Sequence, residues 1–414
     1  MSRHVVILGA GVIGLCTALH CARRGMRVTV LERKSRQRDG CSLGNAGMIV
    51  PSHFIPLAAP GMVRLGLRWM ANPESPFYIR PRLDAGLADW GWKFLRAATR
   101  QRVEAAAPVL AELGLFSRRC FEEIGLEFGL EKRGLLMLCK TQRALDEEAP
   151  LALRSRELGM PAEVLDARAT AALDPDVSLS VAGSVHFPLD CHLSPERFVL
   201  ALEGELERLG VELRWETEVD GFATEGRALR ALQTSAGQIG ADEVVLCGGV
   251  WSAGLARQLD LRIPMQAGKG YSLTLDKPAQ LPQLCSICTE ARLAVTPMQG
   301  RLRVGGTMAL DGLNEAIQER RVRGIIRSFQ EYFPAFADAD FADIRPWSGL
   351  RPVPPDGMPY LGRTQRWTNL TLATGHAMMG LSLAPATGSI VAGLLDHEPS
   401  PVALELLSPD RFAR

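Results

Sequence analysis

Residues 4–32 read HVVILGAGVIGLCTALHCARRGMRVTVLE, with three closely spaced glycines between two apolar runs. His4–Leu8 is a short, largely β-branched run, which is typical of a buried strand. Leu15–Arg24 has helical character, with Gly25 as a C-terminal cap, and Val28–Leu31 is a second apolar run. The order strand, helix, strand predicts the first unit of a doubly wound parallel sheet.

The glycines of this stretch form the pattern G-x-G-x-x-G over Gly9–Gly14. The first allows a tight turn, the second lets backbone approach a pyrophosphate, and the third lets the helix pack closely on the strand. Glu32 follows Gly14 by 18 positions, at a strand end where a carboxylate accepts hydrogen bonds from ribose hydroxyls. These features predict a dinucleotide site and disfavour the 2′-phosphate of NADP. The alternative, a glycine-rich turn without a ligand, does not account for the position of Glu32.

Three later segments also carry glycine-rich turns. Residues 41–49, CSLGNAGMI, can bring backbone N–H groups close to a diphosphate or a planar ring, although an ordinary mobile loop has similar composition. Ala241–Cys247 is expected to be a strand that leads into residues 248–252, GGVWS. Leu370–Ala373 is expected to be a strand followed by a glycine turn, and Pro385–Leu395 a helix with Pro385 in its first turn. These elements would return the chain to the nucleotide domain.

In their order and spacing, these segments resemble the D-amino-acid oxidase and dehydrogenase family of FAD-dependent oxidoreductases. The resemblance runs nearly end to end and rests on Gly9–Gly14 with Glu32, Ser42–Gly47, Gly268–Ser272, Gly349–Pro352 and Gly375–Leu383. Pro51-Ser52 followed by Ala59-Pro60-Gly61 is most similar to the bacterial branch of D-amino acid and D-hydroxyproline dehydrogenases.

The resemblance implies an α/β fold. A Rossmann-like, doubly wound FAD-binding domain would be interleaved with an α+β substrate domain built on a mainly antiparallel sheet. We expect the FAD domain to comprise residues 1–82, 150–260 and 340–414, and the substrate domain residues 83–149 and 261–339. Within the latter, strands are expected at residues 134–139, 270–275, 291–296 and 302–305, and helices over residues 83–129.

The cofactor implied by the resemblance is FAD. Some family members attach it to a cysteine near the Gly-Leu-Arg-Pro segment, but residues 350–374 contain no cysteine, so we expect non-covalent FAD. The residues expected to contact it are Gly9, Ala10, Gly11, Val12, Ile13, Gly14, Glu32, Arg33, Ser42, Leu43, Gly44, Asn45, Ala46, Gly47, Met48, Val219, Gly248, Gly249, Trp251, Arg351, Gly375, His376, Met379, Gly380, Leu381 and Ser382. A helix N-terminus near the flavin would stabilise negative charge on the reduced ring.

Three residues are expected to act on the substrate. The resemblance implies that Arg351 binds the substrate carboxylate, a role suited to the planar fork of a guanidinium. The alternatives are a surface arginine in a proline-rich loop, or Arg345 in the same role. Tyr271 could donate to the carboxylate or be a packed strand tyrosine, and His376 could line the pocket or be structural. His53 and Met48 are further pocket candidates.

The reaction implied by the resemblance is hydride transfer from the Cα–N carbon of a small D-amino or cyclic imino acid to N5 of FAD. Candidate substrates are D-proline and 4-hydroxy-D-proline, and a quinone or a carrier protein would accept the electrons. The substrate must present a neutral amine, and because no His–Asp pair stands out we assign no acid–base residue. The alternatives are a glycine- or sarcosine-type oxidase that uses O2, a non-catalytic FAD-binding subunit of a larger complex and, remotely, an NAD dehydrogenase.

Length, charge and cysteine content indicate which other classes of protein the chain does not fit. A chain of 414 residues is long enough for two domains, and its net charge of +1 does not favour nucleic-acid binding. Nine scattered cysteines indicate reduced thiols, and the lone Cys285-x-x-Cys288 lacks the further ligands of a zinc site, so we expect no metal. Val5–Leu19 resembles a secretory signal, but its spaced glycines favour a strand and a helix. We expect a cytoplasmic protein, with peripheral association with the inner membrane and oligomer formation left open.

Overall fold

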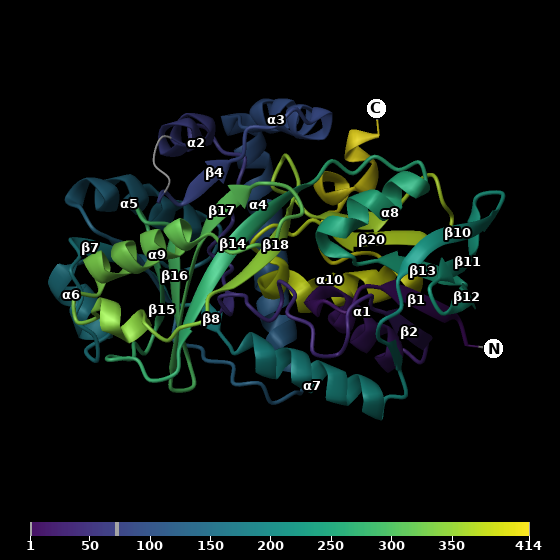
Figure 1. Cartoon of the computed structure of the whole chain (residues 1–414), viewed down its shortest axis with the longest axis horizontal. Helices are drawn as coiled ribbons and strands as arrows, with labels where there is room; N and C mark the ends of the chain where they lie inside the picture. The colour runs from purple at the N-terminus through teal and green to yellow at the C-terminus, as the bar shows by residue number, and fades with distance from the viewer. Residues whose placement is uncertain (1, 71–73, 414) are drawn as a thin grey trace.

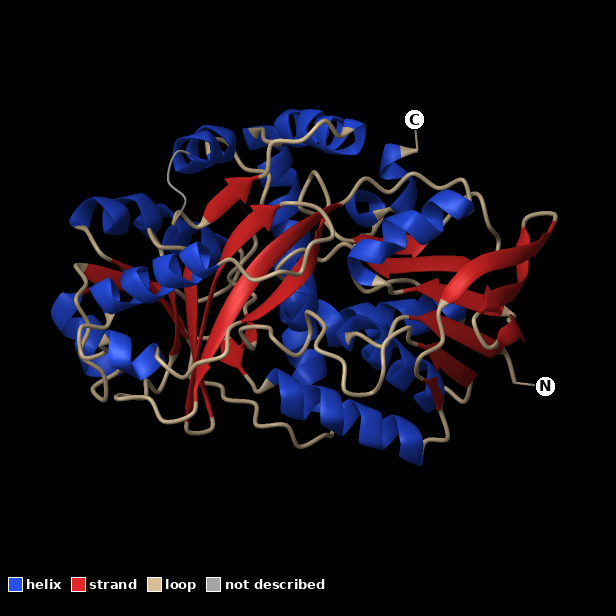
Figure 2. Ribbon diagram, in the orientation of Figure 1, coloured by secondary structure: helices blue, strands red, loops and turns tan. Residues whose placement is uncertain are grey.

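The computed structural model describes residues 2–70 and 74–413 and has the expected α/β fold. Two large sheets lie at opposite ends of the molecule, and helices pack against both (Figure 1, Figure 2). The α-helices are α1 (Val12–Arg23), α2 (Met62–Met70), α3 (Ala85–Ala97), α4 (Arg100–Glu123), α5 (Gln142–Glu157), α6 (Ala167–Leu173), α7 (Pro195–Arg208), α8 (Ser252–Gln258), α9 (Glu319–Tyr332) and α10 (Gly380–Leu395).

The first sheet has the strand order β19-β20-β13-β1-β2-β9, and only β19 runs antiparallel to its neighbour. Its strands are β1 (His4–Leu8), β2 (Arg27–Leu31), β9 (Glu212–Arg214), β13 (Glu243–Leu246), β19 (Tyr360–Arg363) and β20 (Leu370–Thr374). Val5 and Ile7 pack in the core with α1 and α10, whereas Val6 and Leu8 pack in the core with α8 and a three-stranded meander. Because both faces of β1 are covered, Val5–Leu8 form a continuous apolar run rather than an alternating one.

The meander consists of β10 (Val219–Glu225), β11 (Ala228–Thr234) and β12 (Gly237–Gly240). The second large sheet has the order β18-β14-β17-β16-β15-β5-β7-β6, with β4 paired to β17. Its strands are β4 (Phe77–Ile79), β5 (Leu135–Cys139), β6 (Glu163–Asp166), β7 (Gly183–Phe187), β14 (Gln266–Leu275), β15 (Cys285–Cys288), β16 (Leu293–Met298), β17 (Arg301–Leu310) and β18 (Trp347–Val353). Most neighbours are antiparallel, as expected; the pairs β5–β15 and β4–β17 are parallel.

Strand pairing divides the chain between the two large sheets differently from the predicted domain ranges. β4, β6, β7 and β18 pair in the nine-stranded sheet, although residues 1–82, 150–260 and 340–414 were expected to form the FAD domain. Conversely, α4 lies within the range expected for the substrate domain but packs in the core with α1 and α10. Pairing between distant residues, such as Gly268 with Arg351, leaves no local signal in the sequence.

Helix α10 begins earlier than predicted. It starts at Gly380, so Pro385 lies in its second turn rather than its first. Residues 381–384 are buried, and Gly388 approaches α1 so closely that an added Cβ would lie 2.6 Å from the backbone of Cys16. This packing stabilises the additional turn even though Pro385 has no N–H to donate.

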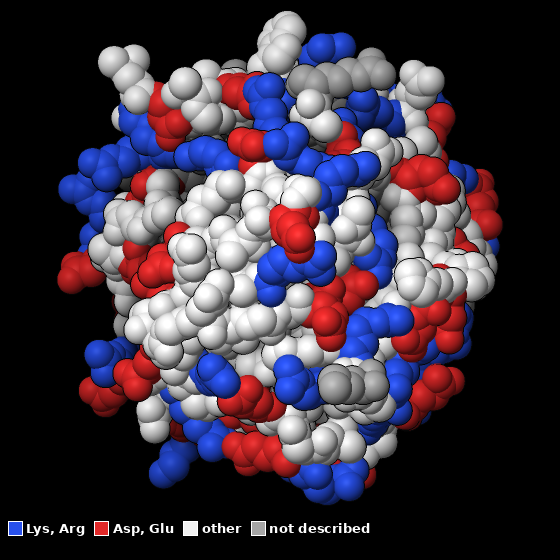
Figure 3. All heavy atoms as spheres, turned by 90° about the vertical axis from the view of Figure 1, so that its right-hand side faces the viewer, with Lys and Arg blue, Asp and Glu red and all other residues white. Residues whose placement is uncertain are grey.

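Three further observations concern membrane-spanning helices, metal sites and surface charge. None of the described helices combines the length and hydropathy needed to cross a bilayer. Within residues 2–70 and 74–413, no cluster of His, Cys, Asp and Glu side chains has an arrangement that could hold a metal ion. Basic and acidic side chains are interspersed on the face that lies to the right in Figure 1 and toward the viewer in Figure 3.

Candidate active site

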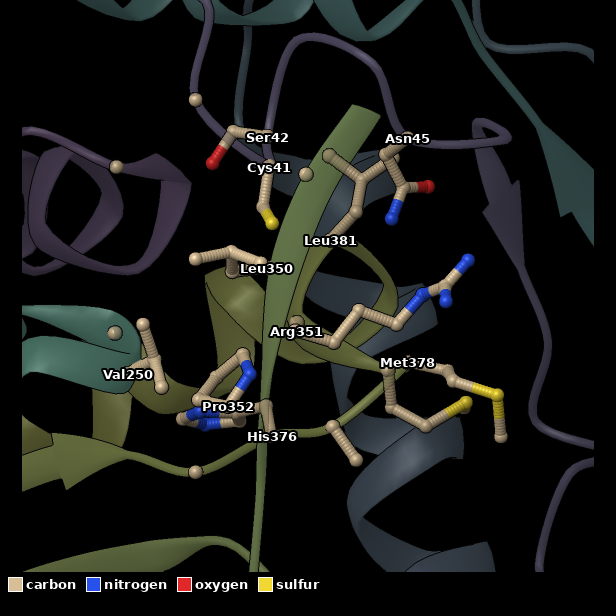
Figure 4. Close-up of a pocket in the computed structure, with 18 of the residues that line it drawn as sticks. Cys41, Ser42, Asn45, Val250, Leu350, Arg351, Pro352, His376, Met378 and Leu381 are labelled. Atoms are coloured by element: carbon tan, nitrogen blue, oxygen red, sulfur yellow. The ribbon is translucent and has the colours of Figure 1, made fainter. Parts of the chain in front are cut away.

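A cavity of about 1090 Å³ lies where the carboxyl ends of the parallel strands meet the nine-stranded sheet. This volume is slightly above the range of about 300–1,000 Å³ that is typical of ligand pockets. The strand ends of an open α/β sheet are the usual place for a nucleotide. Figure 4 shows side chains from the loop after β2, from β18 and from the turn before α10, with Arg351 extending between Asn45 and Met378.

The fingerprint turn forms one end of the cavity. Gly9 has a φ of +105°, and an added Cβ would lie 2.7 Å from the carbonyl oxygen of Cys247. An added Cβ at Gly14 would lie 1.9 Å from the Gly9 carbonyl oxygen, so this glycine allows α1 to pack on β1. The Val12 N–H donates to Ser42 Oγ at 2.9 Å, and the first turn of α1 contains no acidic residue. The helix N-terminus therefore suits an anionic ligand.

Glu32 borders the cavity at the end of β2. Its carboxylate accepts hydrogen bonds from the Ala10 N–H at 2.9 Å and the Lys34 N–H at 3.0 Å. These contacts orient the carboxylate and leave lone pairs for further donors such as ribose hydroxyls. Arg33 also borders the cavity, with its guanidinium carbon 3.9 Å from the centre of the Trp251 ring.

Arg303 holds the glycine-rich loop from the side of the nine-stranded sheet, and sequence reasoning missed it. Its guanidinium donates to the carbonyl oxygens of Leu43 and Asn45, both at 2.9 Å, and forms an ion pair with Glu196. The side chain is buried, with its Nε donating to Thr274. Because the partners lie far apart along the chain, only an arginine in an otherwise apolar strand could have hinted at this contact. These bonds order the segment whose composition also fitted a mobile loop.

Arg351 projects from β18 into the cavity. Its guanidinium lies on Gly270, where an added Cβ would come within 2.2 Å of the guanidinium nitrogens, and it donates to the Thr307 carbonyl at 2.7 Å. Thr307 has a φ of +69° at an irregularity in the pairing of β14 with β17, which turns its carbonyl toward the arginine. No acidic side chain of the described residues pairs with Arg351, and burial lowers its pKa. Since a half-buried charge without an ionic partner is costly, this geometry suits an anionic ligand.

The chain is similar to known proteins over nearly its whole length. Residues 4–394 match the model of the family described as FAD dependent oxidoreductase. The chain belongs to this family. A D-amino acid dehydrogenase of Bradyrhizobium diazoefficiens is 32% identical over 422 residues, covering 99% of each chain. Another, from Cereibacter sphaeroides, is 33% identical over 425 residues, covering 99% of this chain and 97% of the relative.

Solved structures of the same fold include two amino acid enzymes. The glycine oxidase from Geobacillus kaustophilus has a TM-score of 0.76 at 23% identity, with 99% of both chains covered. The L-proline dehydrogenase from P. horikoshii has a TM-score of 0.77 at 18% identity, covering 100% of this chain and 98% of that chain. At these identities the likeness shows the fold alone.

The cavity fits the FAD of this family. The N-terminus of α1 suits the pyrophosphate, Glu32 suits a ribose, and the backbone at Gly9 and Gly44 leaves no room for a side chain. Two cysteines, Cys41 and Cys247, border the cavity, and burial raises their pKa to about 11 and about 12, so both are protonated thiols. Non-covalent attachment stays a prediction, and this protonation is compatible with it.

Tyr271 is placed where it does not support the predicted role at the substrate. Residues alternate across β14, so Gly268 and Gly270 share the face of Arg351 whereas Tyr271 and Lys269 point to the other face. The Tyr271 ring is 1% exposed and packs in the core beneath α9, although the residue borders the cavity. Burial raises its pKa to about 12. The alternative of a packed strand tyrosine therefore describes this residue better than the carboxylate donor we predicted.

His376 borders the cavity in the turn before α10. Its Nε2 lies 3.0 Å from Thr387 Oγ1, and burial lowers its pKa to about 3, so the ring is neutral. The neighbouring Gly375 and Ala377 have φ values of +75° and +47°. The hydrogen bond to α10 fixes this strained turn, which gives His376 a structural part beside any contact with FAD.

Nearly all the predicted cofactor residues border the cavity. The exceptions are Ala10, Gly14 and Gly47, which lie behind the surface. Ala10 donates to Glu32, and Gly47 has a φ of +75° with an added Cβ only 2.2 Å from the carbonyl oxygen of Leu193. These three residues can shape the site without contacting FAD. His53 also borders the cavity.

Proposed function

We propose that this protein oxidises the Cα–N bond of a small D-amino or cyclic imino acid to an imine and passes the electrons to a quinone or a carrier protein. The observation that carries the proposal is the half-buried Arg351 guanidinium in the cavity, which has no carboxylate partner among the described residues. Bound FAD supplies the acceptor of the hydride. The D configuration is taken from relatives named D-amino acid dehydrogenase that share about a third of the sequence.

The surroundings of Arg351 can orient such a substrate. The planar guanidinium can bind a carboxylate through two parallel hydrogen bonds, while the Thr307 carbonyl holds it in place. Gly270 and Gly305 of the neighbouring strand β17 leave space on the same side of the sheet. A bidentate contact fixes the direction of the α-carbon, which is the main contribution that the protein makes to hydride transfer.

Apolar side chains next to this position favour a small or cyclic substrate. Met308 follows Thr307 and packs in a cluster with Trp90, Phe77, Leu57 and Phe94, all of which border the cavity. These side chains would exclude water and favour an apolar substrate ring. D-proline and 4-hydroxy-D-proline meet this requirement and are the substrates to test first.

The proposal predicts that the purified yellow protein is bleached by a D-amino acid under argon. A panel of D-amino acids, including D-proline, should reduce the flavin absorbance, whereas the L-enantiomers should not. No bleaching by any D-amino acid, or equal bleaching by both enantiomers, would contradict the proposal. An oxidase is the second candidate because the fold matches a glycine oxidase. Stoichiometric peroxide during turnover in air would favour that candidate over the dehydrogenase.

We further propose that the protein meets its quinone at an anionic lipid surface, through α2 and α3. Figure 1 shows both helices along one edge of the molecule, outside β4. Large apolar side chains of α3 and the residues just before it are exposed to solvent: Leu83, Trp92 and Leu95 are 108%, 62% and 51% exposed. Residues 62–102 contain eight Arg or Lys and three Asp or Glu, a strong excess in a chain of net charge +1. Apolar side chains among basic ones are typical of helices that lie in the headgroup region.

This surface gives a second prediction. The wild-type protein should sediment with vesicles that contain anionic phospholipid and much less with purely zwitterionic vesicles, and salt should weaken the binding. Trp92→Glu with Leu95→Glu should reduce binding by about tenfold or more, because two apolar contacts become charges of the lipid's own sign. Leu200→Glu is the matched control, since Leu200 is 63% exposed on the distant helix α7. Equal binding by the double variant, or no binding by the wild type, would favour a soluble carrier instead.

A further inference from the structure

A buried carboxylate lies beside the cavity, outside the residues described so far. Asp190 is 1% exposed and accepts hydrogen bonds from both the N–H, at 3.2 Å, and the hydroxyl of Ser52. These two residues meet because β3 (Met48–Ile49) pairs antiparallel with β8 (Cys191–His192). The pairing brings residues 50–53, which follow β3, alongside Asp190, which precedes β8. Ser52 in turn contacts His53, whose Nδ1 lies 3.2 Å from Ser52 Oγ.

The donor and the acceptor in each of these hydrogen bonds can be assigned by elimination. An ionised carboxylate only accepts, so the Ser52 hydroxyl donates to Asp190. Ser52 Oγ can then accept the Nδ1–H of His53, which leaves a lone pair on Nε2. His53 borders the cavity, and none of the described residues forms a hydrogen bond with Nε2. The hydrogen-bonded series Asp190–Ser52–His53 therefore ends at His53 Nε2, a proton acceptor that a substrate in the cavity can reach.

The proposed reaction needs such an acceptor. An amino acid arrives in neutral solution with an ammonium group, whose nitrogen has no lone pair to assist departure of the α-hydride. One proton must therefore leave before or during oxidation. An Arg351-bound carboxylate neutralises the guanidinium but takes no proton, and His376 is already engaged with Thr387.

Resting on the proposed function, we propose that Asp190 receives the ammonium proton through His53 and Ser52. The N–H bond of the ammonium breaks as the Nε2–H bond forms, and the Nδ1–H proton passes to Ser52 Oγ. The Ser52 proton passes to Asp190, which becomes a neutral carboxylic acid. Three protons each move one position, His53 changes from one neutral tautomer to the other, and no other reactant is needed. The reverse path returns the proton to water once the product has left.

The electrostatics suit Asp190 as the final acceptor. Burial raises its pKa to about 7, with the Ser52 hydrogen bonds and the nearby Arg118 acting in the opposite direction. Cys191 and Cys285 are the other titratable neighbours, and burial raises the pKa of both, so they remain neutral thiols. A group whose pKa lies near the working pH is the best proton acceptor.

His53 suits the part of a carrier rather than that of the final acceptor. Burial, together with Arg292, which also borders the cavity, lowers its pKa to about 4. Glu148 lies on the same cavity wall and near Arg292, and burial raises its pKa. The imidazolium form is thus unfavourable, whereas exchange between the two neutral tautomers adds no charge to the cavity.

The pH dependence follows from the state of Asp190. Only the ionised carboxylate can accept a proton, so kcat/KM should fall as the pH decreases through about 7. Asp190→Asn lacks the final proton acceptor, so only substrate whose amine is already deprotonated in solution reacts. We expect a loss on the order of 10²-fold at pH 8, shrinking to within about threefold at pH 10 where free amine is plentiful. A merely structural defect would lower activity equally at every pH.

Three further variants sharpen this test. Ser52→Ala removes the link and should reproduce the pH profile of Asp190→Asn, whereas Ser52→Thr keeps a hydroxyl and should stay within about threefold of the wild type. Asp174→Asn is the matched control, because Asp174 is a buried carboxylate that accepts from the backbone of Gln283 and Leu284. It should keep the wild-type profile. Infrared difference spectra of the holoenzyme should show a carboxylic-acid band that titrates near pH 7 and is absent in Asp190→Asn.

The possible failures are distinct. If the wild-type flavin is bleached by a D-amino acid but Asp190→Asn and Ser52→Ala keep its rate and pH profile, the relay is wrong and the proposed function stands. The relay is also wrong if these variants lose activity by the same factor at pH 8 and pH 10. If the wild-type flavin is bleached by no amino acid, the proposed function fails and the relay fails with it.

Discussion

Arg351→Ala should lower kcat/KM for the D-amino acid substrate by about 30-fold to several thousand-fold, with FAD still bound. A buried, bidentate contact to a charged group contributes about 2–5 kcal/mol, and each 1.4 kcal/mol corresponds to a factor of about ten. Most of the loss should appear in KM if the contact is equally strong in the ground and transition states, and in kcat if it orients the α-carbon. The measurement is anaerobic flavin reduction by stopped flow, over a range of substrate concentrations.

Two comparisons make this result specific. Arg351→Lys should recover only part of the activity, because a point charge cannot form two parallel hydrogen bonds. Arg345→Ala is the control for the other arginine considered from the sequence, and since Arg345 is exposed it should behave like the wild type. An amide of the substrate, which lacks the carboxylate, should react equally slowly with the wild type and Arg351→Ala. An unchanged kcat/KM in Arg351→Ala would contradict the carboxylate-binding role of Arg351, on which the proposed function rests.

The second large effect is expected from Gly14→Ala. The added Cβ would lie 1.9 Å from the carbonyl oxygen of Gly9, and because that atom belongs to the backbone, α1 must move away from β1. Overpacking of this kind costs about 1–3 kcal/mol of stability. The same shift displaces the N–H groups at the start of α1, so FAD affinity should fall by about tenfold or more. Absorbance of bound flavin after gel filtration and thermal unfolding with and without added FAD measure both effects.

Gly204→Ala is the matched control for this substitution. Gly204 is an exposed helical glycine of α7 with nothing within 4 Å of an added Cβ. Alanine there should stabilise the protein by about 0.5–1 kcal/mol and leave FAD binding unchanged. If Gly14→Ala binds FAD as tightly as this control, α1 and β1 can separate without disturbing the cofactor site, and our account of the fingerprint is wrong.

The sequence was sufficient for the nucleotide half of the site because its contacts are local. Gly9, Gly14 and Glu32 lie within two strands and the helix between them, and each has a requirement that few other residues meet: a positive φ, a missing Cβ or an anionic strand end. The resemblance extended this prediction to Arg351, whose partners in β14 and β17 the sequence alone does not reveal. Position in a motif therefore identified the residue, and only the structure explained its environment.

Tertiary structure decided the features that depend on pairing between distant segments. The register of β14 with β18 places Gly270 beneath Arg351 and turns Tyr271 to the opposite face, although both residues belong to one predicted motif. Packing of α10 on α1 added a helical turn before Pro385, against the local preference of proline. A shift of one residue in a strand exchanges its two faces, so no local property of residues 268–272 could have predicted which side chain enters the cavity.

Local chemistry therefore determined that this chain binds a dinucleotide and where its fingerprint begins, because those requirements are met within about 30 consecutive residues. The fold alone determined that Arg303 holds the loop at residues 43–45 and that Asp190 meets Ser52. Both contacts join segments that are far apart in sequence, and the physical reason is the same. Long-range strand pairing creates them, and it leaves no periodic pattern in either segment by itself.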